Sequence, residues 1–115
     1  MRFGESVIYK VLGLGITLLI SSAALQAAPP PDAAALFNKN CSICHRTDGK
    51  GFPALKTPDF TDGKWQAAHP DKELMEVIKN GKKGTPMPAF DGKLNDEEIK
   101  ALVTYIRAFD SSKKK

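Results

Sequence analysis

The sequence predicts an all-α fold with about three main helices joined by long loops. Near the C-terminus, apolar residues recur at three- and four-residue steps, which is the spacing of one face of an α-helix. Residues that typically begin or end helices flank two further segments. No stretch of alternating β-branched and aromatic residues is long enough to predict a sheet. A chain of 115 residues has room for one domain at most.

The first 27 residues have the pattern of a secretory signal peptide. Arg2 and Lys10 supply positive charge, and residues 11–20 form an apolar run shorter than the roughly 20 residues of a membrane-spanning helix. Small residues follow, so cleavage is expected near Ala27. This would leave a single domain, residues 28–115, in the bacterial periplasm. The alternative is that the segment stays uncleaved as a membrane anchor.

Two of the predicted helices have clear start and stop signals. Asp32 can cap a helix over residues 33–40, because its side chain can accept a hydrogen bond from the first turn. A second helix is expected over residues 71–80, where Gly81 would end it. Residues 49–66 lie between them and are rich in Gly, Pro, Asp and Lys, which predicts a long loop that wraps around something.

The third helix has the strongest pattern. Asn95 can cap it, and Glu98 stands three residues later, where it can close a capping box. Beyond these residues, one face is apolar over the next three turns, so this face is expected to pack in the core. The apolar residues are Ile99, Leu102, Val103, Ile106 and Phe109.

The two cysteines and one histidine form the chemical centre of the sequence, as Cys41-Ser42-Ile43-Cys44-His45. A zinc site would need about four ligands, and the chain has no second cysteine pair. A thiol redox pair of the thioredoxin kind would need strands alternating with helices. Covalent haem attachment uses all three residues, with two thioethers to the cysteines and the imidazole of His45 as an iron ligand. The motif therefore favours one covalently bound haem c.

A second iron ligand is expected in the segment Gly84-Thr85-Pro86-Met87-Pro88-Ala89-Phe90. Met87 lies between two prolines, which predicts a stiff, extended loop that presents one thioether sulfur. Such a sulfur is a suitable ligand for haem iron. Met75 lies in an apolar helical pattern and is expected to fill the core. His69 is the competing ligand, although its place before a proline at a helix start favours a surface position.

With these motifs in place, residues 32–109 resemble the class I cytochromes c, especially the small bacterial monohaem type. The resemblance implies an all-α cytochrome c fold, with about three main helices and long loops wrapped round the haem. In that family an aromatic residue four positions before the first cysteine packs on a pair in the last helix. Phe37 matches the first position, and Leu102 with Tyr105 match the pair.

The resemblance also implies two further cofactor-binding residues. The backbone carbonyl of Pro53 would accept a hydrogen bond from the ring N–H of His45 and so orient the imidazole. The indole N–H of Trp65 would donate to a haem propionate. Alternatively, Pro53 only turns the loop and Trp65 is a buried aromatic with some other partner.

A six-coordinate haem has no vacant position for a substrate, so a soluble periplasmic single-electron carrier is expected, and no enzyme. Two alternatives stay open. One is a haem-bound electron-transfer subunit of a larger redox enzyme, and the other is a haem sensor or weak peroxidase with a labile Met87. Expected partners are redox proteins, such as a membrane or periplasmic oxidase, reductase or dehydrogenase, with no small-molecule substrate. The protein is expected to be a monomer, in contact with a membrane only if its N-terminal segment is retained.

The charge balance agrees with protein partners. A formal net charge of +4 is too mild to indicate nucleic-acid binding. Lys50, Lys82 and Lys83 are expected near the exposed haem edge, where they would steer a partner.

Overall fold

Five α-helices and two short 3₁₀ helices make up the part of the chain that the computed structural model describes, residues 31–114, which contains no named strand. The predicted signal peptide, residues 1–27, lies outside the described residues. None of the helices within residues 31–114 has the length and apolar character needed to cross a bilayer. In chain order the elements are α1 (Ala33–Asn40), α2 (Ser42–His45), η1 (Pro53–Leu55), α3 (Gly63–Ala68), α4 (Asp71–Asn80), α5 (Asp96–Arg107) and η2 (Ser111–Lys113).

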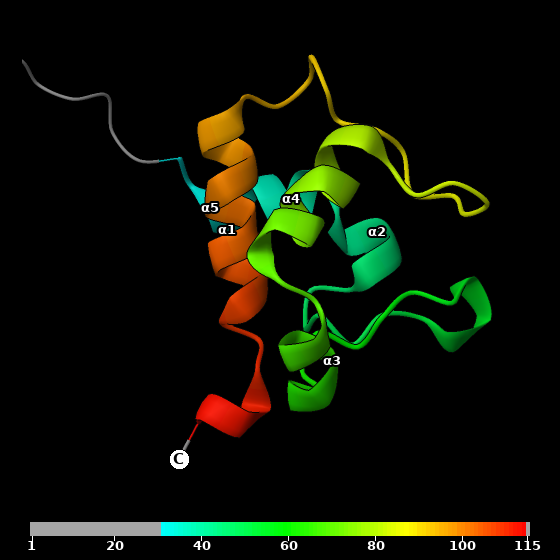
Figure 1. The fold of residues 1–115 in the computed structure, drawn as a ribbon, viewed down its shortest axis with the longest axis vertical. Helices are drawn as coiled ribbons and strands as arrows, with labels where there is room; N and C mark the ends of the chain where they lie inside the picture. The colour runs from blue at the N-terminus through cyan, green and yellow to red at the C-terminus, as the bar shows by residue number, and fades with distance from the viewer. Residues whose placement is uncertain (1–30, 115) are drawn as a thin grey trace, which may run out of the picture.

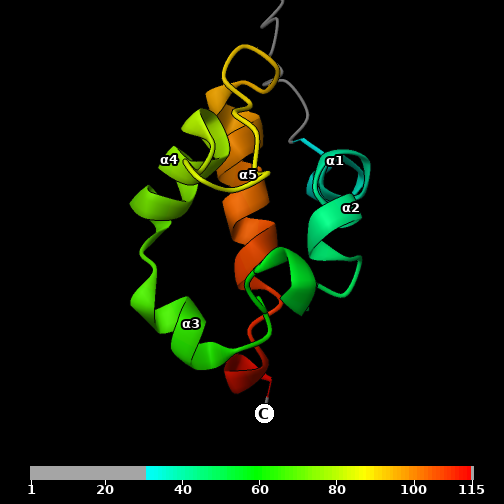
Figure 2. The same cartoon turned by 90° about the vertical axis from the view of Figure 1, so that its right-hand side faces the viewer.

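Helix α5 is the central element of the fold (Figure 1). It packs against α1 on one side and α4 on the other, and the turned view shows it between these two helices (Figure 2). α2 follows α1 directly, whereas α3 lies below α4 near the C-terminal end of α5 (Figure 2). The first and last parts of the domain therefore meet in its centre, and the all-α prediction is confirmed.

The core lies where α1 and α4 meet α5. Phe37 of α1 and Leu102 of α5 are fully buried, and Ile99 is 1% exposed. The ring of Phe37 lies 5.1 Å from that of Tyr105 between centroids, so the contact that the family resemblance implied is present. The other buried apolar residues are Phe60, Leu74, Ile78, Phe90, Val103 and Ile106.

The helix caps form as the sequence predicts. The Asp32 carboxylate accepts a hydrogen bond of 3.0 Å from the Ala35 N–H. At α5 the capping box is complete, because the Asn95 side chain accepts from the Glu98 N–H at 2.8 Å and the Glu98 carboxylate accepts from the Asn95 N–H at 2.9 Å. These bonds satisfy N–H groups that have no partner inside the helix. The helix ends at Arg107, before the predicted Phe109, which lies in the following turn.

Helix α3 was missed, because it forms inside the segment predicted to be a loop. Asp62 caps it by accepting a hydrogen bond of 2.9 Å from the Lys64 N–H. The helix has only six residues, too few to show an apolar period of 3.6. Its middle residues, Trp65 and Gln66, lie against the rest of the domain.

Candidate functional site

A cavity of about 570 Å³ opens between the helices and is lined by residues from α1 through α5 and from the loops. Most of the lining side chains are apolar, and the cavity also contains the predicted thiols, imidazole and thioether. Of the six predicted cofactor-binding residues, five lie on its wall: Cys41, Cys44, His45, Trp65 and Met87. The structure thus brings together groups that are up to 46 residues apart in the sequence, from Cys41 to Met87.

The Cys-Ser-Ile-Cys-His motif forms a single helical turn at the end of α1. The carbonyl of Cys41 accepts hydrogen bonds from the N–H groups of Cys44, at 3.1 Å, and His45, at 2.9 Å. Residues three and four apart lie on one side of a helix, so this turn directs both cysteines and the histidine toward the same cavity. The two cysteines are not joined by a disulfide.

The ring of His45 packs against Phe60, with centroids 4.7 Å apart and planes inclined by 15°. Burial lowers the pKa of His45, which favours the neutral imidazole, the form that binds a metal. Burial also raises the pKa of the Cys41 thiol to about 11. The Nδ1 atom of His45 is buried without a hydrogen-bond partner among the described residues.

The hydrogen bond predicted between Pro53 and His45 is not present. Pro53 begins η1, and its carbonyl accepts the Lys56 N–H at 3.0 Å, the bond that closes this 3₁₀ turn. Pro53 is also absent from the cavity wall, whereas Pro58 is part of it. The proline segment does follow the histidine, as predicted. The sequence did not indicate that Pro53 begins a 3₁₀ turn whose closing hydrogen bond uses the Pro53 carbonyl.

Met87 approaches the cavity on a loop that is tied down at both ends. The Phe90 N–H donates to the carbonyl of Ile78 at 3.0 Å, and the Lys82 N–H donates to that of Met87 at 3.3 Å. Gly81, which ends α4, has a φ of +74°, and a Cβ there would lie 2.9 Å from the Met87 carbonyl oxygen. The loop can therefore fold back over α4 only because this residue is glycine.

Trp65 and His69 form the wall beside α3. The Trp65 ring lies 5.1 Å from Phe60 and 4.4 Å from His69, measured between centroids. Nδ1 of His69 donates to the Trp65 carbonyl oxygen at 2.8 Å, since a carbonyl can only accept. His69, the competing ligand, is thus a wall residue whose ring is already held by its neighbour.

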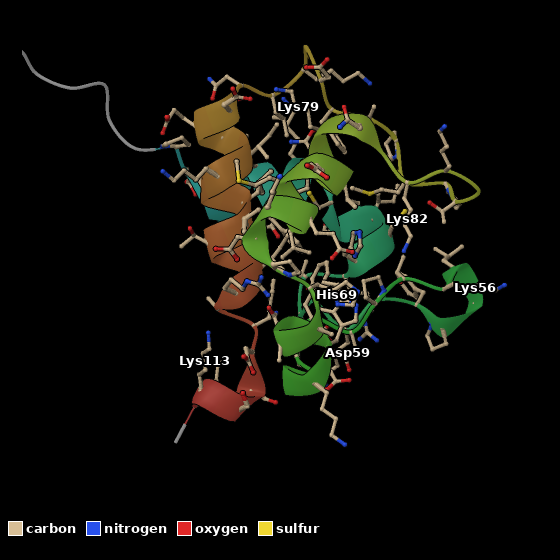
Figure 3. The ribbon with its side chains drawn as sticks, in the orientation of Figure 1. Lys56, Asp59, His69, Lys79, Lys82 and Lys113 are labelled. Carbon is tan, nitrogen blue, oxygen red and sulfur yellow. The ribbon has the colours of Figure 1, made fainter. Side chains whose placement is uncertain are left out.

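Several residues of this site were missed by sequence reasoning. Phe60 and Gln66 are buried, and Arg107 binds the carbonyl of Gln66 in α3 and that of His69 just after it. Phe60 and Gln66 lie in a stretch with no apolar period, and Arg107 lies on the polar side of the predicted last helix, so no local pattern marks these residues. Two lysines, Lys56 and the predicted Lys82, line the cavity and lie on loops that project on the same side of the molecule (Figure 3).

The residues fit a haem. The volume lies within the range of about 300–1,000 Å³ that is usual for cofactor sites. The wall combines apolar surface with nitrogen and soft sulfur groups, which suit a flat, largely apolar iron cofactor.

Comparisons with known proteins agree with this geometry. The family model described as "Cytochrome C oxidase, cbb3-type, subunit III" matches residues 28–106. The cbb3-type cytochrome c oxidase subunit FixP of Bradyrhizobium sp. (strain ORS 278) is 38% identical over 85 residues, which cover 71% of this chain and 29% of the relative. Cytochrome c6 of Thermosynechococcus vestitus (strain NIES-2133 / IAM M-273 / BP-1) is 31% identical over 98 residues, covering 84% of this chain and 86% of the relative. The chain thus spans under a third of the oxidase subunit it matches.

Solved structures show the same fold. The KustC0563 c-type cytochrome superposes with a TM-score of 0.65 at 35% identity, covering 70% of this chain and 99% of the other. The c-type cytochrome NirC superposes with a TM-score of 0.56 at 22% identity, covering 66% and 85%, and supports the fold alone.

Proposed function

Because this chain belongs to the class I c-type cytochromes, the family shown by the cbb3-type subunit III match, we propose that it carries single electrons on one covalently attached haem c. The observation that carries the proposal is the convergence of Cys41, Cys44, His45 and Met87 on one largely apolar cavity. When bound, haem supplies an iron that changes by one electron between its ferrous and ferric states.

The residues of the cavity have distinct proposed roles. Cys41 and Cys44 would hold the cofactor through thioether bonds, so that a domain this small does not lose it. His45, kept neutral by burial, and Met87 would both bind the iron. With two protein ligands the iron would have no position left for a substrate, which supports a carrier and argues against an enzyme.

The walls would favour the reduced state. Apolar side chains exclude water, which disfavours the more highly charged ferric centre, and a Met/His ligand pair raises the reduction potential. Trp65 is proposed to bind a haem propionate through its indole N–H, which would fix the orientation of the cofactor. Pro53 lies outside the cavity wall, and its carbonyl closes the η1 turn.

The proposed setting is the bacterial periplasm, with redox proteins as donor and acceptor. Lys50, Lys82 and Lys83 are exposed, and Lys56 and Lys82 reach the cavity wall. These cations would steer an acidic partner surface toward the cofactor. Loose steering of this kind suits a carrier that must bind and leave quickly.

A second candidate function is an electron-transfer module of a larger redox enzyme. The similarity to FixP, a subunit of a cbb3-type cytochrome c oxidase, favours it. Fractionation of cells that express the native gene separates the two. A carrier is recovered in the periplasmic extract as a monomer, and a fixed subunit is recovered with the membrane in a larger complex.

The decisive experiment compares Met87→Ala with Met75→Ala in the purified holoprotein. We expect one haem per chain by mass spectrometry and, in the oxidised wild type, the weak absorption band in the red that marks sulfur ligation. Met87→Ala should lose this band, whereas Met75→Ala should keep it, because Met75 packs against the core. Absence of a haem mass increment would refute the proposal. A normal band in Met87→Ala would refute the assignment of the ligand and direct the same test to His69.

A further inference from the structure

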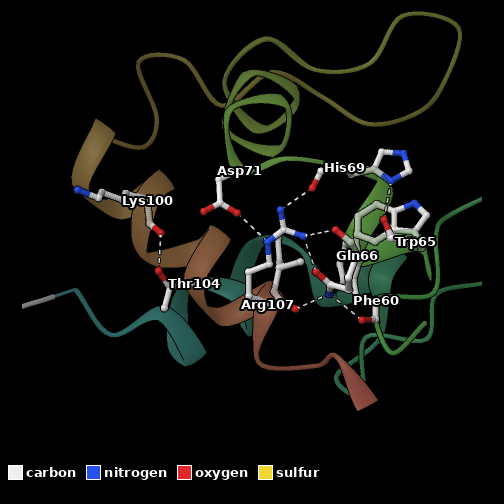
Figure 4. Close-up of polar contacts among 9 residues, drawn as sticks. Phe60, Trp65, Gln66, His69, Asp71, Lys100, Thr104 and Arg107 are labelled. Atoms are coloured by element: carbon white, nitrogen blue, oxygen red, sulfur yellow. Dashed lines mark hydrogen bonds and ion pairs between the residues drawn. The ribbon is translucent and has the colours of Figure 1, made fainter. Parts of the chain in front are cut away.

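We infer that buried Gln66 and partly buried Arg107 form a positioning unit for the cofactor, which holds both the packing partner of His45 and the Trp65–His69 wall. The inference rests on the proposed haem function and adds two residues that do not themselves reach the cavity. Figure 4 shows the contacts of the unit.

Gln66 is only 5% exposed, and its side-chain amide is fully engaged. Its Nε2 group donates to the backbone carbonyls of Phe60, at 2.8 Å, and Ile106, at 2.9 Å. Its Oε1 accepts from Arg107 at 2.7 Å. One side chain thus joins α3 to the segment at Phe60 and to the end of α5, up to 41 positions after Gln66 in the sequence, and loss of such a buried bond leaves a polar group unsatisfied.

Arg107 completes the unit from the C-terminal end of α5. Its guanidinium donates to the Gln66 carbonyl at 2.8 Å and also to the His69 carbonyl. Its Nε donates to the Asp71 carboxylate at 2.7 Å. Because a guanidinium has a fixed, planar set of donors, these bonds fix the path of the chain from α3 to α4.

The unit reaches the proposed iron ligand through Phe60. The carbonyl of Phe60 is held by Gln66, its N–H donates to the Gly49 carbonyl at 2.8 Å, and its ring stacks on the His45 imidazole. Since His45 Nδ1 has no hydrogen-bond partner in the described chain, this stacked ring is a main constraint on the plane of the imidazole. A shift of Phe60 would therefore rotate the ligand.

The same unit holds the other wall. Arg107 binds the carbonyl of His69, whose ring stacks on Trp65 at 4.4 Å and donates to the Trp65 carbonyl. Without the guanidinium, residues 65–69 would lose three hydrogen bonds to α5 and keep the bond from Gln66 to Ile106, and water would enter beside the cofactor. More water around the iron favours the ferric state.

The test uses the holoprotein and the variants Gln66→Met and Arg107→Lys. Methionine keeps the length of the side chain but makes none of the three hydrogen bonds, and lysine keeps the charge but not the planar set of donors. The matched control is Val103→Ala, which creates a cavity in the core on the same helix, makes none of the side-chain hydrogen bonds of the unit and is not part of the cavity wall. The readouts are the midpoint potential, the low-temperature EPR g-values of the oxidised protein and the melting temperature, Tm.

We expect both variants to lower the ratio of reduced to oxidised protein, measured at a fixed potential, at least threefold. A tenfold change in this ratio corresponds to a shift in midpoint potential of about 59 mV for one electron. The g-values should shift in Gln66→Met, because they report the orientation of the axial ligands. The double variant should shift the potential by less than the sum of the two single changes, since both act through one unit. Val103→Ala should lower Tm but keep the midpoint potential and the g-values of the wild type.

The inference is overturned if Gln66→Met and Arg107→Lys lower Tm but keep the wild-type potential and g-values. It is also overturned if Val103→Ala shifts the potential as much at an equal loss of Tm. If Gln66→Met does not retain haem, Arg107→Lys decides by the same criteria, because it preserves charge and most of the side-chain length. A wild-type protein without haem would instead refute the proposed function, and this is seen before any variant is made.

Discussion

Replacing Phe37 by alanine should remove a large part of the stability of the domain. The side chain is fully buried, and its ring has aromatic neighbours on α5, Tyr105 at 5.1 Å, and just after it, Phe109 at 5.4 Å. Truncation of a buried Phe costs about 3–5 kcal/mol through lost burial and the cavity left behind. Aromatic pairs add about 0.5–1.5 kcal/mol each beyond burial, so the upper part of this range is expected.

A loss of about 4–5 kcal/mol is severe against the roughly 5–15 kcal/mol by which domains are usually stable. Urea unfolding of the oxidised holoprotein, followed by Trp65 fluorescence, measures it as a lower midpoint with an unchanged slope. Leu36→Ala is the matched control on the same helix, because Leu36 is only partly buried and should cost clearly less. A loss below about 2 kcal/mol in Phe37→Ala, or a loss equal to that of Leu36→Ala, would refute the view that Phe37 joins α1 to α5.

Two further predictions concern the polar contacts. Asn95→Ala removes the capping box of α5 and should lower the free energy of unfolding by about 1 kcal/mol, which calorimetry would detect as a lower Tm. A change in Tm within error would show that Glu98 alone satisfies the N–H groups at the start of the helix. The hydrogen bond from the Ser112 hydroxyl holds the pKa of Asp110 below its ordinary value, so this group contributes stability above pH ~4 that is lost as the pH falls through the lowered value. Urea midpoints should therefore fall less between pH 5 and pH 3 in Asp110→Asn than in the wild type, and equal losses in both proteins would contradict the assignment.

Local signals in the sequence were sufficient for the main helices and for the chemical groups of the site. Asp32 and Asn95 cap where predicted, because capping depends on a side chain and its nearest N–H groups. The Cys41–His45 motif likewise forms within one helical turn. Met87 could be proposed because the prolines on either side of it leave few conformations for its loop.

The supporting residues could not be predicted, because their partners are far away in the chain. Gln66 looks like any polar residue until Ile106 lies beside it, 40 positions later. Arg107 looks like a basic residue on the exposed side of a helix, yet its guanidinium binds Gln66 in α3 and the His69 carbonyl just after that helix. Pro53 shows the opposite case, in which a local turn uses the carbonyl that the family resemblance had assigned elsewhere.

The packing of α1 on α5 also has a consequence for biosynthesis. Phe37 lies four residues before Cys41, and most of its burial depends on a helix that begins at Asp96. Because synthesis proceeds from the N-terminus, the newly made chain cannot pack Phe37 on α5 until this last helix has emerged. If haem is attached as proposed, the Cys41–His45 turn would therefore stay open to attachment until α5 has formed.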